Sequence, residues 1–226
     1  MTTNAPKFSA LRLGRCADES HAHATRVAQR WDGLEARLQS KMAELASLDR
    51  SAEHQLLTRA FQATNATSRI FWLRQSADAA TLEASKLAAC RKGCNHCCHI
   101  AVVISRTEAT VIAKQTGAKL RRGAGAYTGA TMADPQALQE GIAKEHYGSP
   151  CPFLEGGACS IYESRPLACR WQMNMDDDDL LCQLVADDGD APKVPYLNLM
   201  SHQLAVAALL GENQSFDDIR NWFEQE

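Results

Sequence analysis

The hydrophobic pattern of the first half of the chain predicts amphipathic helices. Between residues 21 and 48, apolar side chains recur at three- and four-residue steps, at Val27, Trp31, Leu34, Leu38, Met42, Leu45 and Leu48. This spacing is typical of a helix that buries one face. We therefore expect one helix over 21–48. Trp31 in this helix, and Trp72 and Trp171 later in the chain, are expected to be buried in the core.

Further helices follow a break at residues 49–51. Apolar positions predict a second helix over 51–74, and Ser76 is a suitable N-cap for a shorter, alanine-rich helix over 77–90. After a strand-like stretch at 100–104, the pair Ser105 and Glu108 has the spacing of a capping box and predicts a helix to about Thr116. Later segments predict a glycine-rich loop at 117–135, a helix at 136–146, turns at 151–169, a helix at 196–210 and a last short helix that 215–218 caps.

These elements predict a mainly α fold with little β structure. We divide the chain into a loose leader at 1–20, a helical arm at 21–89, a cysteine-rich domain at 90–185 and C-terminal helices at 186–226 that pack on the domain. The run of aspartates that begins at Asp176 is expected to be a solvated charge run.

Composition and charge restrict the function. The 226 residues include 24 Lys plus Arg and 27 Asp plus Glu, for a net charge of −3, which argues against a nucleic-acid or anionic-membrane partner. No stretch approaches the roughly 18 apolar residues that a membrane helix needs. The first 20 residues have no apolar signal core. We therefore expect a cytoplasmic protein with reduced thiols.

Cysteine is the unusual feature, because eight of the nine cysteines follow residue 89. Clustered, reduced cysteines are interpreted first as metal ligands. The first group has the spacing C-x3-C-x2-C-C, at Cys90, Cys94, Cys97 and Cys98. A straight helix would separate Cys90 from Cys98 by about 12 Å, whereas the sulfurs around one zinc lie within roughly 4 Å of one another. A helix can therefore offer three of these thiols to one ion, and a bend at Gly93 could bring in Cys90.

The second group contains Cys151, Cys159 and Cys169, with Cys182 further along. Gly156-Gly157 predicts a tight turn that places Cys151 and Cys159 across a hairpin. Arg165 and Arg170 bring positive charge near the thiolates. Eight thiols exceed the four that one zinc or one cubane cluster needs, so either two centres form or some cysteines are redox-active or idle. Zinc, copper(I) and iron–sulfur clusters all suit thiolates. His96 and His99 flank the cysteine pair and are less favoured candidates for zinc ligands, because such histidines more often face solvent or support the ligands.

At these residues the sequence resembles the YkgJ-type cysteine-cluster proteins, a family described as zinc- or iron-chelating with a CxxCxxCC signature. Residues 90–98 carry the signature with one extra residue after Cys90, and 151–170 resembles the family's second block. The resemblance, over roughly residues 85–185, implies zinc or iron at the eight cysteines and leaves open whether Cys90 and Cys182 bind. Flagellin lysine methylases carry a similar domain with an iron–sulfur cluster, which implies a [4Fe-4S] cofactor as one alternative.

Three functions remain open from the sequence. The first is a metal-chelating module whose fold is stapled by thiolate–metal bonds, with a protein partner or a homodimer formed through the helical arm. The second is an iron–sulfur-dependent protein-modifying enzyme of methyltransferase type, although the glycines at 123–129 lack a cofactor-loop spacing. The third is thiol–disulfide exchange through the Cys94-Asn-His-Cys97 unit. Cys16, in the leader, is excluded from the site.

Overall fold

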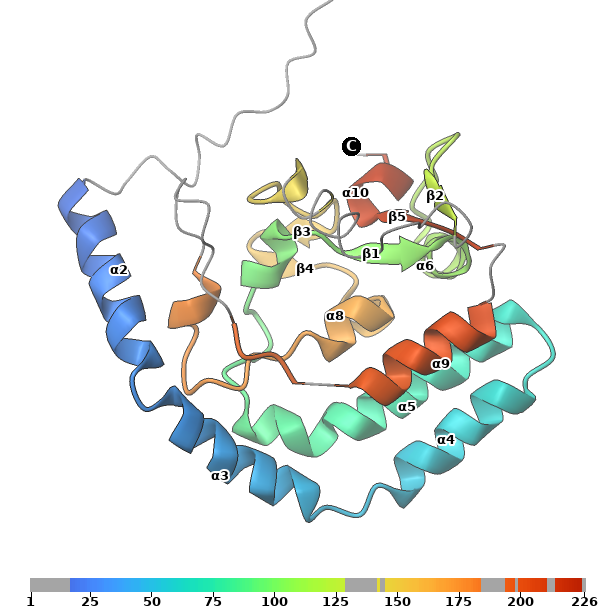
Figure 1. Cartoon of the computed structure of the whole chain (residues 1–226). Helices are drawn as coiled ribbons and strands as arrows, with labels where there is room; N and C mark the ends of the chain where they lie inside the picture. The colour runs from blue at the N-terminus through green and yellow to red at the C-terminus, as the bar shows by residue number, and fades with distance from the viewer. Residues whose placement is uncertain are drawn as a thin grey trace, which may run out of the picture.

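Helices dominate this computed structural model, which describes residues 17–128, 142, 145–183, 194–197, 199–210 and 214–224 (Figure 1). The predicted mainly α class is confirmed. The α-helices are α2 (Ala17–Trp31), α3 (Leu34–Ala46), α4 (Ser51–Gln62), α5 (Ala66–Leu87), α6 (Arg106–Thr116), α8 (Leu167–Trp171), α9 (Met200–Leu210) and α10 (Ile219–Trp222). Short 3-10 helices are η1 (His96–His99), η3 (Tyr162–Ser164) and η4 (Leu180–Cys182). Within the described residues, no helix is both long and apolar enough to span a membrane.

The helix breaks in the N-terminal arm differ from those expected. The single helix predicted over 21–48 is interrupted at Gly33, whose φ of 72° places it in the left-handed region. The helix predicted over 51–74 ends at Gln62, and α5 begins after Asn65, whose side chain accepts a hydrogen bond from the Ser68 backbone N–H. Ser76 is therefore no cap. It is fully buried within the 22-residue helix α5, and its Oγ donates to the Glu53 carbonyl at 3.1 Å.

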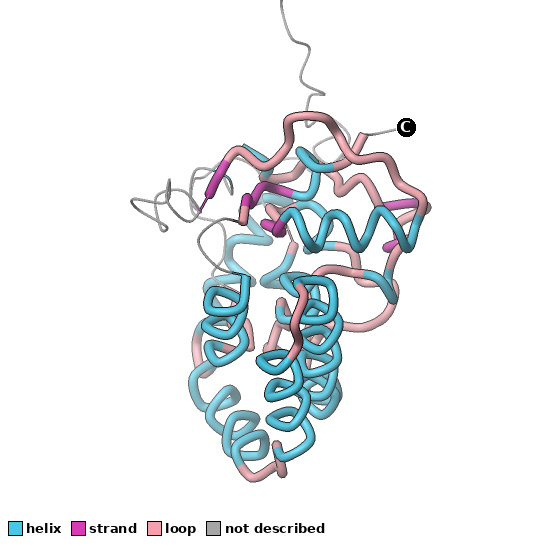
Figure 2. Tube along the Cα trace, turned by 90° about the vertical axis from the view of Figure 1, so that its right-hand side faces the viewer, coloured by secondary structure: helices cyan, strands magenta, loops and turns pink. Residues whose placement is uncertain are grey.

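A small antiparallel sheet joins the middle of the chain to its C-terminal part. Its order is β1 (Val103–Ser105), β5 (Ser215–Asp218), β2 (Tyr127–Thr128), with Ile104 opposite Asp217. Residues 215–218, expected only to cap a helix, thus form the central strand, after which the Asp218 side chain caps α10. The predicted cap at Ser105 is confirmed, since its side chain accepts from Glu108 N–H at 3.2 Å. Figure 2 shows several helices side by side in one half of the molecule and the strands, with a further helix, in the other.

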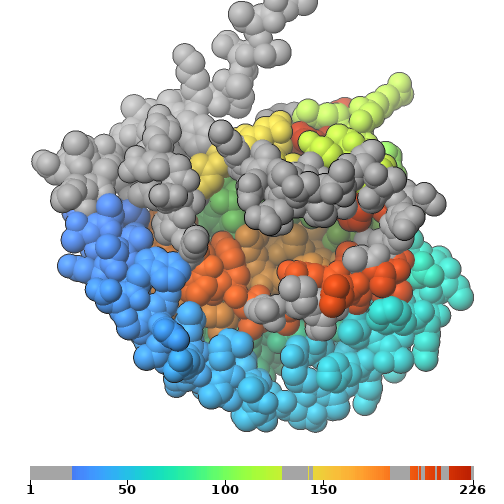
Figure 3. All heavy atoms as spheres, viewed as in Figure 1, coloured from blue at the N-terminus to red at the C-terminus, as the bar shows by residue number. Residues whose placement is uncertain are grey.

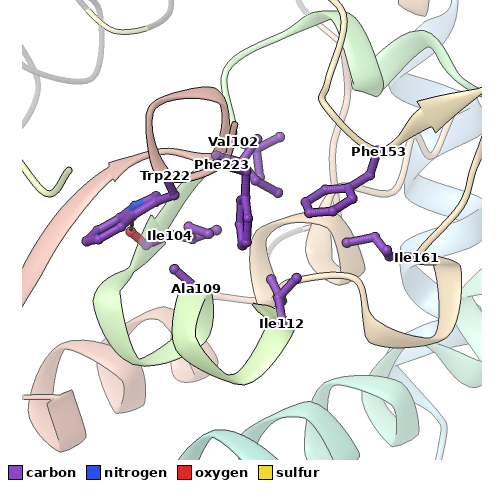
Figure 4. Packing of buried hydrophobic residues seen from close by; sticks show 9 residues of the cluster. Val102, Ile104, Ala109, Ile112, Phe153, Ile161, Trp222 and Phe223 are labelled. Atoms are coloured by element: carbon purple, nitrogen blue, oxygen red, sulfur yellow. Dashed lines mark hydrogen bonds between the residues drawn. The ribbon is translucent and has the colours of Figure 1, made fainter. Parts of the chain in front are cut away.

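Each half has an apolar cluster, and a third, smaller cluster contains Ala84, Met173 and Met175. In the strand-containing half, Phe153 and Phe223 meet edge-on with ring centroids 4.8 Å apart, and Val102, Ile112 and Trp222 pack in the same cluster (Figure 4). In the helical half, residues of α4, α5, α8 and α9 bury a second cluster: Ala60, Ile70, Leu73, Ala77, Leu167, Ala205 and Leu209. The C-terminal helix α9 therefore packs on α4 and α5.

The described part of the aspartate run, residues 176–179, is only in part the solvated surface that its composition indicated. The side chain of Asp176 is fully buried and lies 3.5 Å from Arg30 Nε and 3.6 Å from Arg37. Asp177 contacts Arg37 at 3.1 Å and Lys41 at 2.9 Å. Because α2 and α3 present these cations, the arm binds the run and half-covers it. Figure 3 shows the arm along one edge of the molecule.

Other predictions have mixed outcomes. Trp31 is 43% exposed and so does not anchor a core, whereas Trp72 and Trp171 are partly buried against the helical cluster. Helix α9 begins at Met200 rather than 196, because Tyr196 forms a β-bridge with Asn174. Most of the predicted helix at 136–146, residues 1–16 of the leader, and Cys16 lie outside the described residues.

Candidate metal centre

Seven thiols from two distant stretches of the chain line one cavity of about 310 Å³. They are Cys90, Cys94, Cys97, Cys98, Cys151, Cys159 and Cys169. All of them, and Cys182, are free, partly buried thiols. The cavity walls also include Arg165, Arg170, Tyr162 and the side of α5 around Leu82. The fold therefore brings the two cysteine groups of the sequence to one place.

The first cysteine group is positioned by a turn rather than by a helix. Helix α5 ends at Leu87, and the Cys94 N–H donates to the Arg91 carbonyl at 3.0 Å across Gly93, whose φ is 93°. The bend predicted at Gly93 is thus present. The chain then enters η1, which carries Cys97 and Cys98. The turn lets Cys90 reach the cavity that the later thiols line, which a straight helix would prevent.

The second group is built on a hairpin and a short helix. Strands β3 (Leu154–Glu155) and β4 (Ala158–Cys159) are joined by Gly156 and Gly157 with φ of 54° and 80°, so the predicted tight turn is confirmed. The residue opposite Cys159 is Leu154 rather than Cys151. Cys151 reaches the cavity through another contact, because its N–H donates to the Cys98 carbonyl at 2.7 Å. Helix α8 carries Cys169.

Asn174 connects the eighth cysteine to the first group. Its backbone N–H donates to Cys90 Sγ and its side-chain Nδ2 donates to Cys182 Sγ, each at 3.2 Å. Asn174 is fully buried. Sequence reasoning missed this residue, and nothing in its neighbourhood in the sequence marks it. Its role depends on two contacts, one with Cys90, which lies 84 positions earlier in the sequence, and one with Cys182, which lies 8 positions later.

Arg220 is a second positioning residue that the sequence did not indicate. Its guanidinium is 5% exposed and donates to the carbonyls of Cys98 and Ile100, each at 3.0 Å, and of Ser149 at 2.7 Å. It also pairs with the fully buried carboxylate of Asp218 at 3.0 Å. Arg220 therefore holds the segment after Cys98 against the segment before Cys151.

Burial and charge oppose one another at the thiols. Burial raises the pKa of Cys151 to about 11 and that of Cys182 to about 12, and it raises the pKa of Cys169 well above its usual value. A hydrogen bond shared with Cys98 lowers the pKa of Cys97. Arg165 lowers the pKa of several thiols at once, as the predicted cation near the site. Arg170, the other predicted cation, forms an ion pair with Asp78 at 2.5 Å.

The donor set fits a soft or borderline metal. Thiolates are the ligands of zinc and of iron–sulfur clusters, and a bound cation would offset the cost of deprotonating buried thiols. Among the described residues, no three His, Cys, Asp or Glu side chains already stand close enough to hold one ion. The sulfurs thus share a cavity and would have to close in on a metal. The flanking histidines have other contacts: His96 Nε2 lies 2.9 Å from Asp179 Oδ2, and His99 Nδ1 lies 3.2 Å from the Asn95 carbonyl.

Comparison with known proteins identifies this same region. Residues 89–185, a little under half of the chain, match the family described as "CxxCxxCC: Putative zinc- or iron-chelating domain". No curated protein and no solved structure matches the chain. The matched region contains all eight thiols described above. Residues 89–185 are therefore similar to this zinc- or iron-chelating family, and the match supports metal binding by the cysteine cluster in this part of the chain.

Proposed function

We propose that the chain acts as a metal-chelating module in a reducing compartment such as the cytoplasm, with zinc or iron held by thiolates between Cys90 and Cys182. One observation carries the proposal: seven of these thiols, from stretches on either side of the sheet strands β1 and β2, line a single cavity. A packed core of inert cysteines would instead fill its space with apolar contacts.

The chain's own residues prepare the site for a cation. Arg165, which stacks over Tyr162 at 4.1 Å, offsets part of the negative charge that several thiolates would create. Asn174 and Arg220 fix the backbone around Cys90, Cys98 and Cys151 through the hydrogen bonds given above. A bound metal would add a positive charge that keeps the thiols deprotonated, and their protons would leave to solvent.

Anaerobic purification followed by elemental analysis tests the proposal. We expect stoichiometric zinc or iron, largely lost in the Cys97→Ser variant because Cys97 lies among the other thiols. The matched control is Cys16→Ser, which should retain the metal. A wild-type protein that folds without metal, or equal metal content in the two variants, would contradict the proposal.

The exposed wall of the cavity supports a second candidate function, that of an enzyme. Besides sulfur, the cavity is lined by Asp78, Thr81, Leu82 and Ser85 of α5, and Leu82 is 62% exposed. The cavity of about 310 Å³ therefore extends from the thiols to an exposed part of α5, where a substrate group could approach. This favours the iron–sulfur-dependent protein-modifying enzyme over a closed structural site. A brown protein that absorbs near 400 nm and contains about four irons per cluster would support it, whereas a colourless zinc protein would contradict it.

A further inference from the structure

The segment 174–182 lies between the arm helices and the thiols (Figure 1). Lys41 of α3 contacts it from the arm side, where its Nζ donates to the carbonyls of Met175 and Asp176 at 2.8 and 3.0 Å. The same Nζ lies 2.9 Å from a carboxylate oxygen of Asp177. One lysine of the arm therefore holds three successive residues of the segment.

Two arginines of the arm hold the segment as well. The side chain of Asp176 is fully buried, and neither of its carboxylate oxygens accepts a hydrogen bond from the described residues. Its charge is balanced instead by Arg30 Nε at 3.5 Å and Arg37 Nη2 at 3.6 Å. Arg30 also pairs with Asp178. Because a buried carboxylate is unfavourable without a countercharge, the arm stabilises the segment in this position.

The opposite side of the segment contacts the thiols and η1. Asn174 donates to Cys90 Sγ and to Cys182 Sγ, each at 3.2 Å. Further along the segment, Asp179 Oδ2 lies 2.9 Å from Nε2 of His96, the first residue of η1. The segment therefore supports the thiol-bearing part of the chain at more than one point.

Hydrogen bonds within the segment join its two sides. Asn174 Oδ1 accepts from the Asp176 N–H at 2.9 Å. Asn174 Nδ2, the donor to Cys182, also donates to the Asp178 carbonyl at 3.0 Å. Asp176 and Asp178 are residues that Arg30 contacts from the arm. A movement of these two aspartates away from the arm would therefore also move the amide that supports Cys182.

From these contacts we propose that the arm is a latch: Arg30, Arg37 and Lys41 hold the segment 174–182 against the thiols and thereby strengthen metal binding. The inference rests on the metal-chelating function proposed above. It assigns a part in that function to helices outside the family match at 89–185. The three cations are positioning residues, because they act on the thiols through the segment. Release of the latch lets the segment withdraw and weakens the hold on the metal.

Zinc affinity of the full-length chain, measured by chelator competition, tests the latch. Lys41→Met removes two hydrogen bonds and an ion pair to the segment. We expect about tenfold weaker zinc binding, since residues that support metal ligands typically contribute about 10- to 100-fold. The control Lys114→Met, at an exposed position of α6, should bind zinc as the wild type does. Equal affinities of the two variants would overturn the latch alone, whereas a wild type that takes up neither zinc nor iron would also overturn the proposed function.

Two further measurements separate positioning from a general loss of stability. Lys41→Arg keeps the charge and the donors, so it should recover most of the zinc affinity, and binding as weak as that of Lys41→Met would overturn the assigned role. In hydrogen exchange of the zinc-loaded chains, Lys41→Met should speed exchange in 174–182 but not in α6. An equal increase in both regions would show that the variant merely destabilises the fold, and it would overturn the latch.

Discussion

The buried guanidinium of Arg220 gives the sharpest prediction of stability. Its side chain pairs with Asp218, which is itself 0% exposed, and donates to carbonyls from two separate segments, including those of Cys98 and Ser149. In Arg220→Met these carbonyls lose their donor and Asp218 keeps a buried charge without its partner. Among the described residues, the donors that remain to the Asp218 carboxylate are the backbone N–H groups of Val102 and residue 220.

The magnitude follows from the cost of breaking a buried ion pair, about 3–5 kcal/mol when one partner is removed. Domains are stable by only about 5–15 kcal/mol, so this is a large share. With a slope of about 2 kcal/mol per molar urea, the unfolding midpoint should fall by about 1.5–2.5 M. Metal content should fall too, because Arg220 holds the segments next to Cys98 and Cys151.

Urea titration followed by circular dichroism measures the effect. Arg220→Lys is the matched control: it keeps the charge but lacks the planar fork of donors, so it should lose less stability than the Met variant. Combining Arg220→Met with Asp218→Asn removes both charges and should recover part of the loss. A Met variant within about 1 kcal/mol of wild type would refute the argument that the pair holds these segments together.

Three further predictions concern other parts of the molecule. Burial lowers the pKa of His202, so the unfolded chain takes up a proton at this histidine before the folded chain does as pH falls below about 6.5. The free energy of unfolding should therefore decrease between pH 7.5 and 5.5. His202→Gln should weaken this pH dependence of the urea midpoint, and an unchanged pH dependence would contradict the prediction. A Cβ at Gly125 would lie 2.7 Å from both Ser215 Oγ and the Trp222 ring, whereas one at Gly123, also with positive φ, meets open space. Gly125→Ala should therefore be about 1–3 kcal/mol less stable than Gly123→Ala in urea titration, and equal midpoints would show that the close contact relaxes freely. Removing metal with a chelator should open residues 90–182 to proteases while far-UV circular dichroism retains most helical signal, because most of the helical cluster comes from α4, α5 and α9, which contain no cysteine; complete loss of helical signal would contradict this.

Local sequence signals predicted the features that depend on local interactions. The cap at Ser105, the bend at Gly93 and the hairpin turn at Gly156 and Gly157 all follow from backbone preferences and short-range hydrogen bonds. The convergence of two cysteine blocks was predictable for a similar reason, since many thiols in one reduced chain have few other uses. The structure places seven of those eight thiols around one cavity.

Features that depend on distant partners could not be predicted in this way. A run of four aspartates looks solvated until Arg30, Arg37 and Lys41 are placed beside it, and these cations come from helices more than 130 positions earlier in the chain. Residues 215–218 look like a helix cap because Asp218 is one, yet their strand pairing requires β1 on one side and β2 on the other. Periodicity likewise cannot show that Gly33 divides the first helix, because the apolar stripe continues across the break.

One group of side chains shows why burial must be known before chemistry is assigned. Ser76 Oγ lies 2.9 Å from His202 Nε2, and His202 Nδ1 lies 3.6 Å from Glu53 Oε1. The order serine, histidine, carboxylate is that of a hydrolase triad. Here Ser76 and His202 are both 0% exposed, and Ser76 also donates to the Glu53 backbone carbonyl. A nucleophile must reach a substrate carbonyl, so this network instead fastens α9 to α4 and α5. Burial thus makes the same three residue types structural here, whereas seven of the thiols line a cavity.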